Sequence, residues 1–411
     1  MECSRWWLAL SFGALGCRGA PAARPVIVIE VENPSDAPRE ATGVTVSIAS
    51  LGAVVPYELS AYDGNTELPL QVDDFDTDGT PDTLAFQVNL APKERKSIRL
   101  EQKPPSRFPR RTHAIVHPEF EGPGWESELI AYRMYLDGRN AIDVYGKAEP
   151  SMGLDRYAHS GKSYHDVQPW GVDVLHVGDS LGCGSFGIWQ NDAIVKPTET
   201  LRTESPNNSL RRFVQVVADG PVRSIVRFIY DYWVVEDAPR RIVATMTIWA
   251  GKRWASSDLD VGKGTRWEGG KWVSHDLHAG EGFRPKIAVG VVALKGAPVT
   301  RKDGFFYTFG AQSDPISDTK KREALGLGVV FDKEDVAGFV DEAPTAGALV
   351  PGDRSRVVLL TPDDKGHLTW GYLATWERGS LGIRDAAAME AECAAAHSEI
   401  TAPATARSAN R

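Results

Sequence analysis

Apolar and polar positions alternate with a period close to two in short runs near the start of the chain. Three such runs lie at residues 26–31, 42–48 and 84–88, and turn-forming residues separate them. Alternation of this kind is typical of strands buried on one face, because successive side chains of a strand point to opposite faces. The spacing of the runs predicts a β-sandwich module over residues 25–102.

A proline-rich, basic stretch at residues 103–111 interrupts this pattern, and we interpret it as a linker. Residues 113–400 contain further strand-like runs with few helical stretches between them, which favours a large antiparallel pair of sheets. Only residues 386–400 have helical spacing, and Asp385 can cap that run. The pattern therefore predicts an all-β fold with a short C-terminal helix, followed by a disordered tail at residues 401–411.

The segment at residues 6–16 is apolar, follows Arg5 and is too short to span a bilayer. It fits the hydrophobic part of a secretory signal covering residues 1–24, and residues 14–17 resemble the lipidation motif of bacterial lipoproteins. We therefore expect an exported protein, either periplasmic or an outer-membrane lipoprotein, whose only membrane contact is a lipid anchor at Cys17. The alternative interpretations are a frayed apolar N-terminus or a misplaced start codon.

The amino-acid composition excludes several classes of binding partner. The chain has 46 Lys plus Arg against 55 Asp plus Glu, a formal charge of −9, which argues against a nucleic-acid partner. The glycines at residues 178–184 match neither common phosphate-binding loop, so a nucleotide is not expected. Beyond the signal segment only Cys183 and Cys393 remain, too few for a disulfide framework or a cysteine-based zinc site.

One acidic loop has the spacing of a calcium site. Asp74, Asp76 and Asp78 alternate and are followed by Gly79, so their oxygens can converge on a hard cation, with Asp82 as a fourth candidate ligand. The twelfth position of a complete calcium loop would need Glu, and this chain lacks it there. The sequence therefore leaves two interpretations, a structural Ca²⁺ or an Asx-rich hairpin turn. No cofactor is expected for the chemistry itself.

The densest cluster of polar and aromatic residues lies between Tyr132 and Asp179, in stretches without regular periodicity. Such a region is more typical of a ligand site than of a packing element. Sugars stack their C–H faces on rings and pair their hydroxyls with planar polar groups, so we interpret the cluster as a glycan site. The candidate substrate-binding residues are Arg139, Asn140, Tyr145, Lys147, Trp170 and Asp173, and the candidate proton-transfer residues are Tyr164 and His165.

Each of these side chains also has a plainer interpretation as a buried packing residue or a hydrogen-bonded core histidine. A second patch at residues 267–278 has the same character and adds His275 to the candidate substrate-binding residues. Its two histidines, His275 and His278, lie three residues apart, but no third metal ligand is evident near them.

Several stretches of the cluster resemble a known family. Residues 139–147, Tyr164 with His165, and residues 170–178 are similar to the signature stretches of the bacterial family catalogued as domain of unknown function 4861. The resemblance implies an exported protein that works near glycan-degrading enzymes, and it implies no particular reaction.

A weaker resemblance concerns the fold. Residues 219–226 and 248–254 look like paired strands of galactose-mutarotase-like supersandwich domains. This implies that residues 113–400 form a large antiparallel β-supersandwich after the N-terminal β-sandwich module. Such domains occur in sugar epimerases, glycosidases and polysaccharide lyases, so the fold leaves the reaction open.

The candidate residues favour a carbohydrate-active enzyme, with a lyase acting on uronate-containing glycans ahead of a hydrolase or an epimerase. A lyase needs groups that neutralise a carboxylate, a base and an acid. Arg139 and Asn140 can bind the carboxylate, and His165 or Tyr164 can move protons, with Lys147 as a further option. A glycosidase would instead use two carboxylates, for which Asp143, Asp166 and Asp173 are available. The non-enzymatic alternative is a glycan-binding surface protein that uses the same rings without proton transfer.

Overall fold

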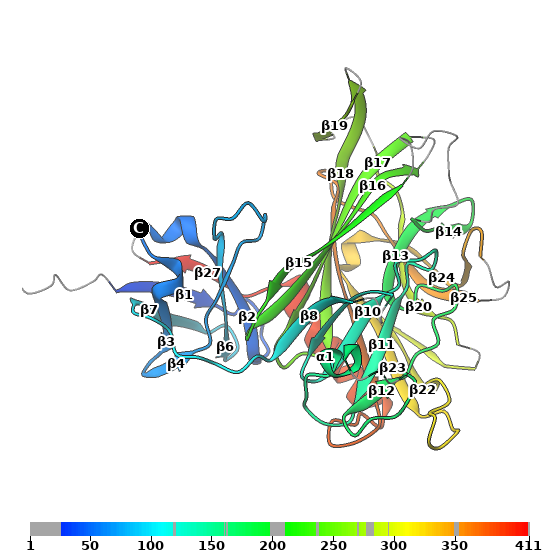
Figure 1. The fold of residues 1–411 in the computed structure, drawn as a ribbon, viewed down its shortest axis with the longest axis horizontal. Helices are drawn as coiled ribbons and strands as arrows, with labels where there is room; N and C mark the ends of the chain where they lie inside the picture. Colours follow the sequence, from blue (N-terminus) through cyan, green and yellow to red (C-terminus); the bar gives the residue numbers. More distant parts are fainter. Residues whose placement is uncertain are drawn as a thin grey trace, which may run out of the picture.

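The computed structural model describes residues 26–117, 121–159, 161, 163–197, 210–235, 238–268, 271–276, 283–294, 296–348 and 353–409. The fold is all-β with a C-terminal helix, as the alternation of the sequence predicts (Figure 1). The signal segment and Cys17 lie outside the described residues, so export and lipidation stay predictions. None of the described helices is long and apolar enough to cross a membrane.

Two sheets form the N-terminal module. One has the strand order β27-β1-β7-β3-β4 and the other β2-β6-β5, and their inward-facing side chains share one apolar core. In β1 buried and half-buried residues alternate strictly, as expected for a sheet packed on one face. The strands are β1 (Ile27–Glu32), β2 (Arg39–Ser47), β3 (Leu59–Asp63), β4 (Thr66–Leu68), β5 (Gln71–Asp73), β6 (Thr83–Leu90), β7 (Arg95–Gln102) and β27 (Thr405–Ser408).

The C-terminal tail differs from the prediction. Residues 401–411 were expected to be disordered, but β27 pairs antiparallel with β1, and Ala404 and Ala406 pack against the core of the N-terminal module. The run is too short and too poor in β-branched residues to be recognised as a strand. The unpaired edge of β1 supplies the backbone partners that make it one.

Buried polar contacts join the N-terminal module to the rest of the chain. The guanidinium of Arg223 forms an ion pair with Asp73 at 2.8 Å, and the side-chain amide of Gln71 donates to the carbonyl of Arg223 at 3.0 Å. These groups are buried and satisfy one another, so the module is held firmly against the large sheet rather than only tethered by residues 103–111.

Three sheets surround the main core of residues 112–376. A nine-stranded sheet contains β15-β16-β17-β18-β26-β23-β22-β21, with β19 paired to β18, and two five-stranded sheets have the orders β12-β11-β10-β9-β8 and β14-β13-β20-β25-β24. One apolar cluster takes residues from all three sheets, which makes the arrangement a large sandwich.

The strands of the two five-stranded sheets are β8 (Thr112–His117), β9 (Gly122–Ser127), β10 (Ile130–Met134), β11 (Ile142–Lys147), β12 (Gly171–Asp173), β13 (Cys183–Gln190), β14 (Ala193–Val195), β20 (Ile287–Val292), β24 (Val336–Pro344) and β25 (Arg354–Leu360). Those of the nine-stranded sheet are β15 (Arg211–Asp219), β16 (Arg223–Val235), β17 (Ala238–Trp249), β18 (Trp254–Glu268), β19 (Lys271–Asp276), β21 (Val299–Lys302), β22 (Phe305–Ala311), β23 (Ala324–Phe331) and β26 (His367–Trp376).

Two helices cover outer faces of this sandwich. Helix α2 (Ala386–Thr401) packs Met389 and Cys393 onto the outer face of the nine-stranded sheet, and the Asp385 carboxylate caps it by accepting from the backbone of Ala388 at 2.8 Å. The short helix α1 (Leu154–Ala158) and the loop after it cover the outer face of the β8–β12 sheet. The position of this loop determines the geometry of the candidate site.

Candidate functional site

The β8–β12 sheet has one apolar face and one charged face. In β10 and β11 the core-facing residues include Tyr132 and Val144, and the intervening positions place Arg133 directly opposite Asp143 on the outer face. Because α1 and its loop cover that outer face, charges that would otherwise be solvated are buried. Burial of charge is costly unless partners satisfy it, so the charged side chains of this face need partners within the protein.

Arg133 is the centre of a buried network. Its Nη2 atom lies 2.8 Å from an oxygen of Asp143 and 3.4 Å from an oxygen of Asp173, and it also donates to the hydroxyl of Tyr135. The side chains of Arg133, Asp143 and Asp173 are 0%, 1% and 3% exposed. Among the described residues the Nη1 atom of Arg133 has no hydrogen-bond partner. Two carboxylates therefore share one guanidinium whose hydrogen-bonding capacity is not used up.

Aromatic rings enclose the guanidinium. The centroid of the Tyr164 ring lies 4.1 Å from the guanidinium carbon, and the centroid of the Tyr135 ring lies 4.2 Å from it. A planar cation stacked on rings is attracted by their electron-rich faces. Arg133 thus fixes the position of Tyr164, which is half-buried at the top of the network.

Burial and charge shift the pKa values of the network. Burial raises the pKa of Asp173 well above its usual range, and the neighbouring Asp143 raises it further, while Arg133 opposes the shift. Burial lowers the pKa of Arg133, but Asp143, Tyr145 and Asp173 outweigh that effect and raise it overall. Asp173 therefore keeps a proton to higher pH than an ordinary aspartate does.

Tyr164 and His165 lie side by side on an irregular turn, in which the backbone of Asp166 donates to the carbonyl of Ser163 at 3.0 Å. Their ring centroids are 4.3 Å apart, and Nδ1 of His165 lies 3.9 Å from an oxygen of Asp173. The His165 side chain is 60% exposed, whereas Asp173 lies beneath it. In a regular strand two adjacent side chains would point to opposite faces, so the turn is what brings both rings to one side.

Arg139 adjoins the same network from its edge. Its guanidinium lies over the Tyr135 ring at 3.4 Å and pairs with Asp137 at 2.6 Å and with Glu121 at 3.3 Å, while 28% of its side chain is exposed. Tyr145, also predicted as a site residue, is buried with its ring 6.5 Å from that of Tyr164, so it belongs to the floor of the network.

Three predicted ligand-binding residues are placed elsewhere. Asn140 is buried in the main core, where its side-chain oxygen accepts from the hydroxyl of Tyr230 at 2.8 Å. Trp170 is 5% exposed and packs edge-on against Tyr157 at 4.5 Å, so it offers no ring face to a ligand. The apolar surroundings that bury these two side chains come from distant strands, which local sequence does not reveal.

Lys147 is the third. Its ammonium lies 2.5 Å from an oxygen of Glu126 and donates to the carbonyls of Ser127 and Ser151 at 2.5 and 2.6 Å, with no exposed side-chain surface. Burial lowers the pKa of Lys147, and the charge of Glu126 counters that effect. All three of its donors have acceptors, so Lys147 stabilises the fold and is not available to a substrate.

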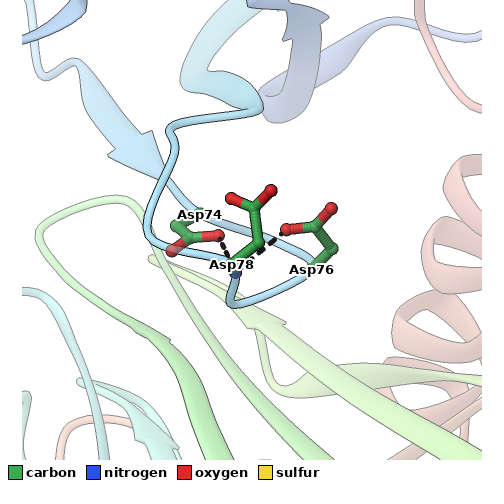
Figure 2. Close-up of side chains that lie close together, drawn as sticks. All are labelled: Asp74, Asp76 and Asp78. Atoms are coloured by element: carbon green, nitrogen blue, oxygen red, sulfur yellow. Dashed lines mark hydrogen bonds between the residues drawn. The ribbon is translucent and has the colours of Figure 1, made fainter.

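The acidic loop after β5 brings oxygens of Asp74, Asp76 and Asp78 within 4.8 Å of one another, and Figure 2 draws these side chains gathered around the Asp78 backbone. The backbone of Asp78 donates to Asp74 and to Asp76, both at 3.1 Å. Asp82 does not join the group, and one of its oxygens accepts from the backbone of Phe75 at 2.6 Å. The three converging carboxylates are hard oxygen donors and fit Ca²⁺, so the calcium site stays a proposal with three ligands rather than four.

Comparison with known proteins identifies the family. A family model described as "Domain of unknown function (DUF4861)" matches residues 31–405. The chain belongs to the DUF4861 family. This confirms the resemblance seen in the sequence, and a comparison with curated proteins finds no match.

Two solved structures are similar to this DUF4861 chain. One is an alpha-mannosidase from Enterococcus faecalis V583, at 10% identity and a TM-score of 0.45, covering 94% of this chain and 46% of that one. The other is a protein in the glycosyl hydrolase family 38 from Enterococcus faecalis, at 10% identity and a TM-score of 0.44, covering 94% and 48%. This chain thus spans about half the length of either structure.

Sequence reasoning about this DUF4861 chain missed Arg133 and Tyr135. The signal was present: Arg133 is a charged position inside a strand whose neighbours Tyr132 and Met134 are apolar, and Asp143 interrupts the next strand in the same way. Two opposite charges at outward positions of consecutive strands predict a cross-strand pair. The predicted residue His275 lies in β19 opposite Gly264, and its side chain and His278 lie outside the described residues.

Proposed function

We propose that this protein is a carbohydrate-active enzyme in which Tyr164 and His165 transfer protons on a bound glycan. One observation carries the proposal: two adjacent proton-transfer side chains, with ring centroids 4.3 Å apart, lie on an irregular turn directly above a buried arginine and a buried aspartate. Exposed acid–base groups held in place by a buried charged network are typical of catalytic sites.

The reaction we favour is β-elimination on a uronate-containing glycan. His165 removes the proton on C5, the C–O bond to the leaving sugar breaks, a carbon–carbon double bond forms, and Tyr164 donates its proton to the leaving oxygen. Asp173, 3.9 Å from the imidazole, orients His165. Arg139, at the exposed edge of the network, is the cation that neutralises the substrate carboxylate.

A hydrolase is the second candidate, and one observation favours it. Asp143 and Asp173 both contact the Arg133 guanidinium, and the pKa of Asp173 is raised by burial, so one carboxyl group can act as acid and the other as base. These carboxyl groups are only 1% and 3% exposed. A glycan therefore meets Tyr164 and His165 first, which places the elimination ahead of hydrolysis.

The test uses the protein incubated with uronate-containing oligosaccharides, followed by absorbance of the conjugated alkene and by a reducing-end assay. His165→Ala and Tyr164→Phe should each lower turnover by about 10²- to 10⁴-fold, with the melting temperature nearly unchanged. His176→Ala and Tyr57→Phe, which change exposed residues outside the network, are the matched controls and should retain turnover.

Each outcome decides between the functions. Alkene formation identifies a lyase, and reducing ends without alkene identify a hydrolase. Near-normal turnover in both variants, or a loss that occurs only together with a lower melting temperature, would place the chemistry elsewhere. Binding without any turnover would identify a glycan-binding protein.

A further inference from the structure

A groove of about 840 Å³ lies on the outer face of the nine-stranded sheet, opposite to the main core. Helix α2 covers one part of this outer face, and the groove lies on another part of it. The acidic loop of the N-terminal module forms one wall, because Phe75, Asp76 and Thr77 line the groove together with strands β15 to β18 and β26. Figure 2 shows this loop above the green strands of the sheet. Its volume falls in the range of about 300–1,000 Å³ that is usual for small-molecule sites.

Arg227 of β16 connects the acidic loop to the sheet that forms the floor of the groove. Nη2 of Arg227 donates to the carbonyl of Phe75 at 2.6 Å, and its guanidinium carbon lies 4.8 Å from the Phe75 ring centroid. Together with the Arg223–Asp73 ion pair at 2.8 Å, this contact fixes the loop over the sheet. The groove is therefore formed in advance by two modules of the chain rather than by a single sheet surface.

The floor is lined by matching positions on neighbouring strands. On β18 and β26, Asp258 lies opposite Thr369 and Asp260 lies opposite His367. The groove floor therefore presents two carboxylates on one strand beside a hydroxyl and an imidazole on the next. The hydroxyl of Thr369 donates to Asp258 at 2.7 Å. The Asp258 residue is exposed in the open groove, yet partial desolvation raises the pKa of its carboxyl, although its hydrogen bond to Thr369 and the charge of His367 oppose the shift.

Arg241 occupies the other side of the floor. The residue opposite it in the strand register is Asp231, but that carboxylate pairs with Arg211 at 2.7 Å. Among the described residues Arg241 makes no ion pair, although it lines the groove. A guanidinium fork with no protein carboxylate is a ready partner for a carboxylate of a ligand.

We propose that this groove is a second saccharide site that binds an acidic oligosaccharide, with a sugar carboxylate on Arg241 and sugar hydroxyls on Asp258 and Asp260. A polyphosphate would be repelled by Asp76, Asp258 and Asp260, and a neutral glycan would leave Arg241 without a partner. A uronate residue presents one anion and several hydroxyl donors, which matches both sides of the floor. The site goes beyond the proposed reaction, because it lies on a different sheet from Tyr164 and His165 and needs no proton transfer.

The test is isothermal titration of the full chain with trigalacturonate, in a His165→Ala background so that no turnover accompanies binding. Arg241→Ala should weaken binding at least tenfold and Asp258→Asn several-fold, whereas Arg95→Ala, an exposed arginine on the N-terminal module, should leave it unchanged. Maltotriose, the neutral probe, should bind at least tenfold more weakly than trigalacturonate. Each variant is compared at an unchanged melting temperature, and Arg241→Gln replaces Arg241→Ala if the latter is unstable.

Three results would overturn the groove site. These are no binding of trigalacturonate to the His165→Ala protein, unchanged affinity in the Arg241 variant, or equal affinity for maltotriose. The proposed elimination is tested separately: it fails if the wild-type protein forms no alkene. Binding that depends on Arg241, together with no alkene formation by the wild-type protein, would support the groove while contradicting the reaction.

Discussion

Two buried ion pairs occupy the same face of the same sheet, and they differ in how completely their polar atoms are satisfied. At one end Lys147 has three acceptors, and its partner Glu126 also accepts from the backbone of Gly153 at 2.8 Å and of Leu154 at 3.0 Å. At the other end Arg133 has two carboxylate partners and an Nη1 atom without a partner among the described residues.

The difference indicates which of the two clusters is suited to chemistry. Lys147 and Glu126 have no unused hydrogen-bonding capacity, and the second oxygen of Glu126 accepts from the backbone at the start of α1. This end therefore stabilises the packing of the covering segment on the sheet. The Arg133 end holds a surplus carboxyl group whose pKa is raised, and it opens to solvent through His165. Both ends bury charge. Only the Arg133 end has unused hydrogen-bonding capacity beside an exposed acid–base pair.

The largest effect should come from breaking the satisfied end. Lys147→Met leaves the Glu126 carboxylate buried without its cation, and we expect the free energy of unfolding to fall by about 3–5 kcal/mol. Denaturant titration measures the loss, and turnover per folded molecule should remain near normal. Lys147→Met combined with Glu126→Gln should recover part of the stability, because the second change removes the uncompensated charge. A loss below about 1 kcal/mol would contradict the structural role of this pair.

At the other end Asp173→Asn should act on catalysis rather than on folding. The variant no longer orients His165, so turnover should fall about 100-fold, equivalent to about 2.7 kcal/mol. Steady-state kinetics across pH give a readout that a purely structural role would not change, since any part of the profile that follows the raised pKa of Asp173 should disappear. Asp166→Asn, an exposed aspartate beside the same histidine, is the control. Equal losses in the two variants would remove Asp173 from the mechanism.

The fold could be predicted further than the site. Alternation in runs such as residues 26–31 encodes burial on one face directly, and Asp385 marks the start of α2 by its capping chemistry. The tail strand β27 could not be predicted, because its pairing depends on the exposed edge of β1 at the other end of the chain.

At the site, the residue composition predicted the region but not the role of each residue. Tyr164, His165 and Asp173 meet as expected for one cluster, whereas Lys147 and Trp170 are buried by a covering segment whose position only tertiary packing determines. Sequence records that a residue is charged or aromatic. Whether its donors are already used depends on carbonyls such as that of Ser151, which no side-chain pattern reveals.

The surplus carboxyl group should also affect stability through pH. Because the pKa of Asp173 is raised in the folded protein, the native state binds more protons than the unfolded state above about pH 4, and its contribution to stability is lost as pH rises through that window. In Asp173→Asn this component should disappear, so the stability difference between variant and wild type should grow in favour of the variant with rising pH. The slope is at most about 1.4 kcal/mol per pH unit. A difference independent of pH would contradict the raised pKa.

The smallest effect should come from the exposed carboxylates of the acidic loop, which contrast with both buried pairs. In water the mutual repulsion of Asp74, Asp76 and Asp78 is screened, and the pKa of Asp76 is nevertheless raised: the hydrogen bond from the Asp78 backbone lowers it, but desolvation and the neighbouring carboxylates outweigh that bond. A bound Ca²⁺ would relieve this repulsion, and binding to the folded state alone raises stability by mass action.

Millimolar Ca²⁺ should therefore raise the melting temperature by a few degrees, and Asp78→Ala should abolish the rise, while Asp36→Ala, a nearly fully exposed aspartate elsewhere on the module, should keep it. Excess chelator should restore the starting value in the wild-type protein. Because the same loop forms a wall of the groove, the calcium-dependent increment and the affinity for trigalacturonate should fall together in Asp78→Ala. No shift with Ca²⁺ would leave the loop as an Asx turn, whose carboxylates are occupied by backbone donors such as Gly79 at 2.8 Å.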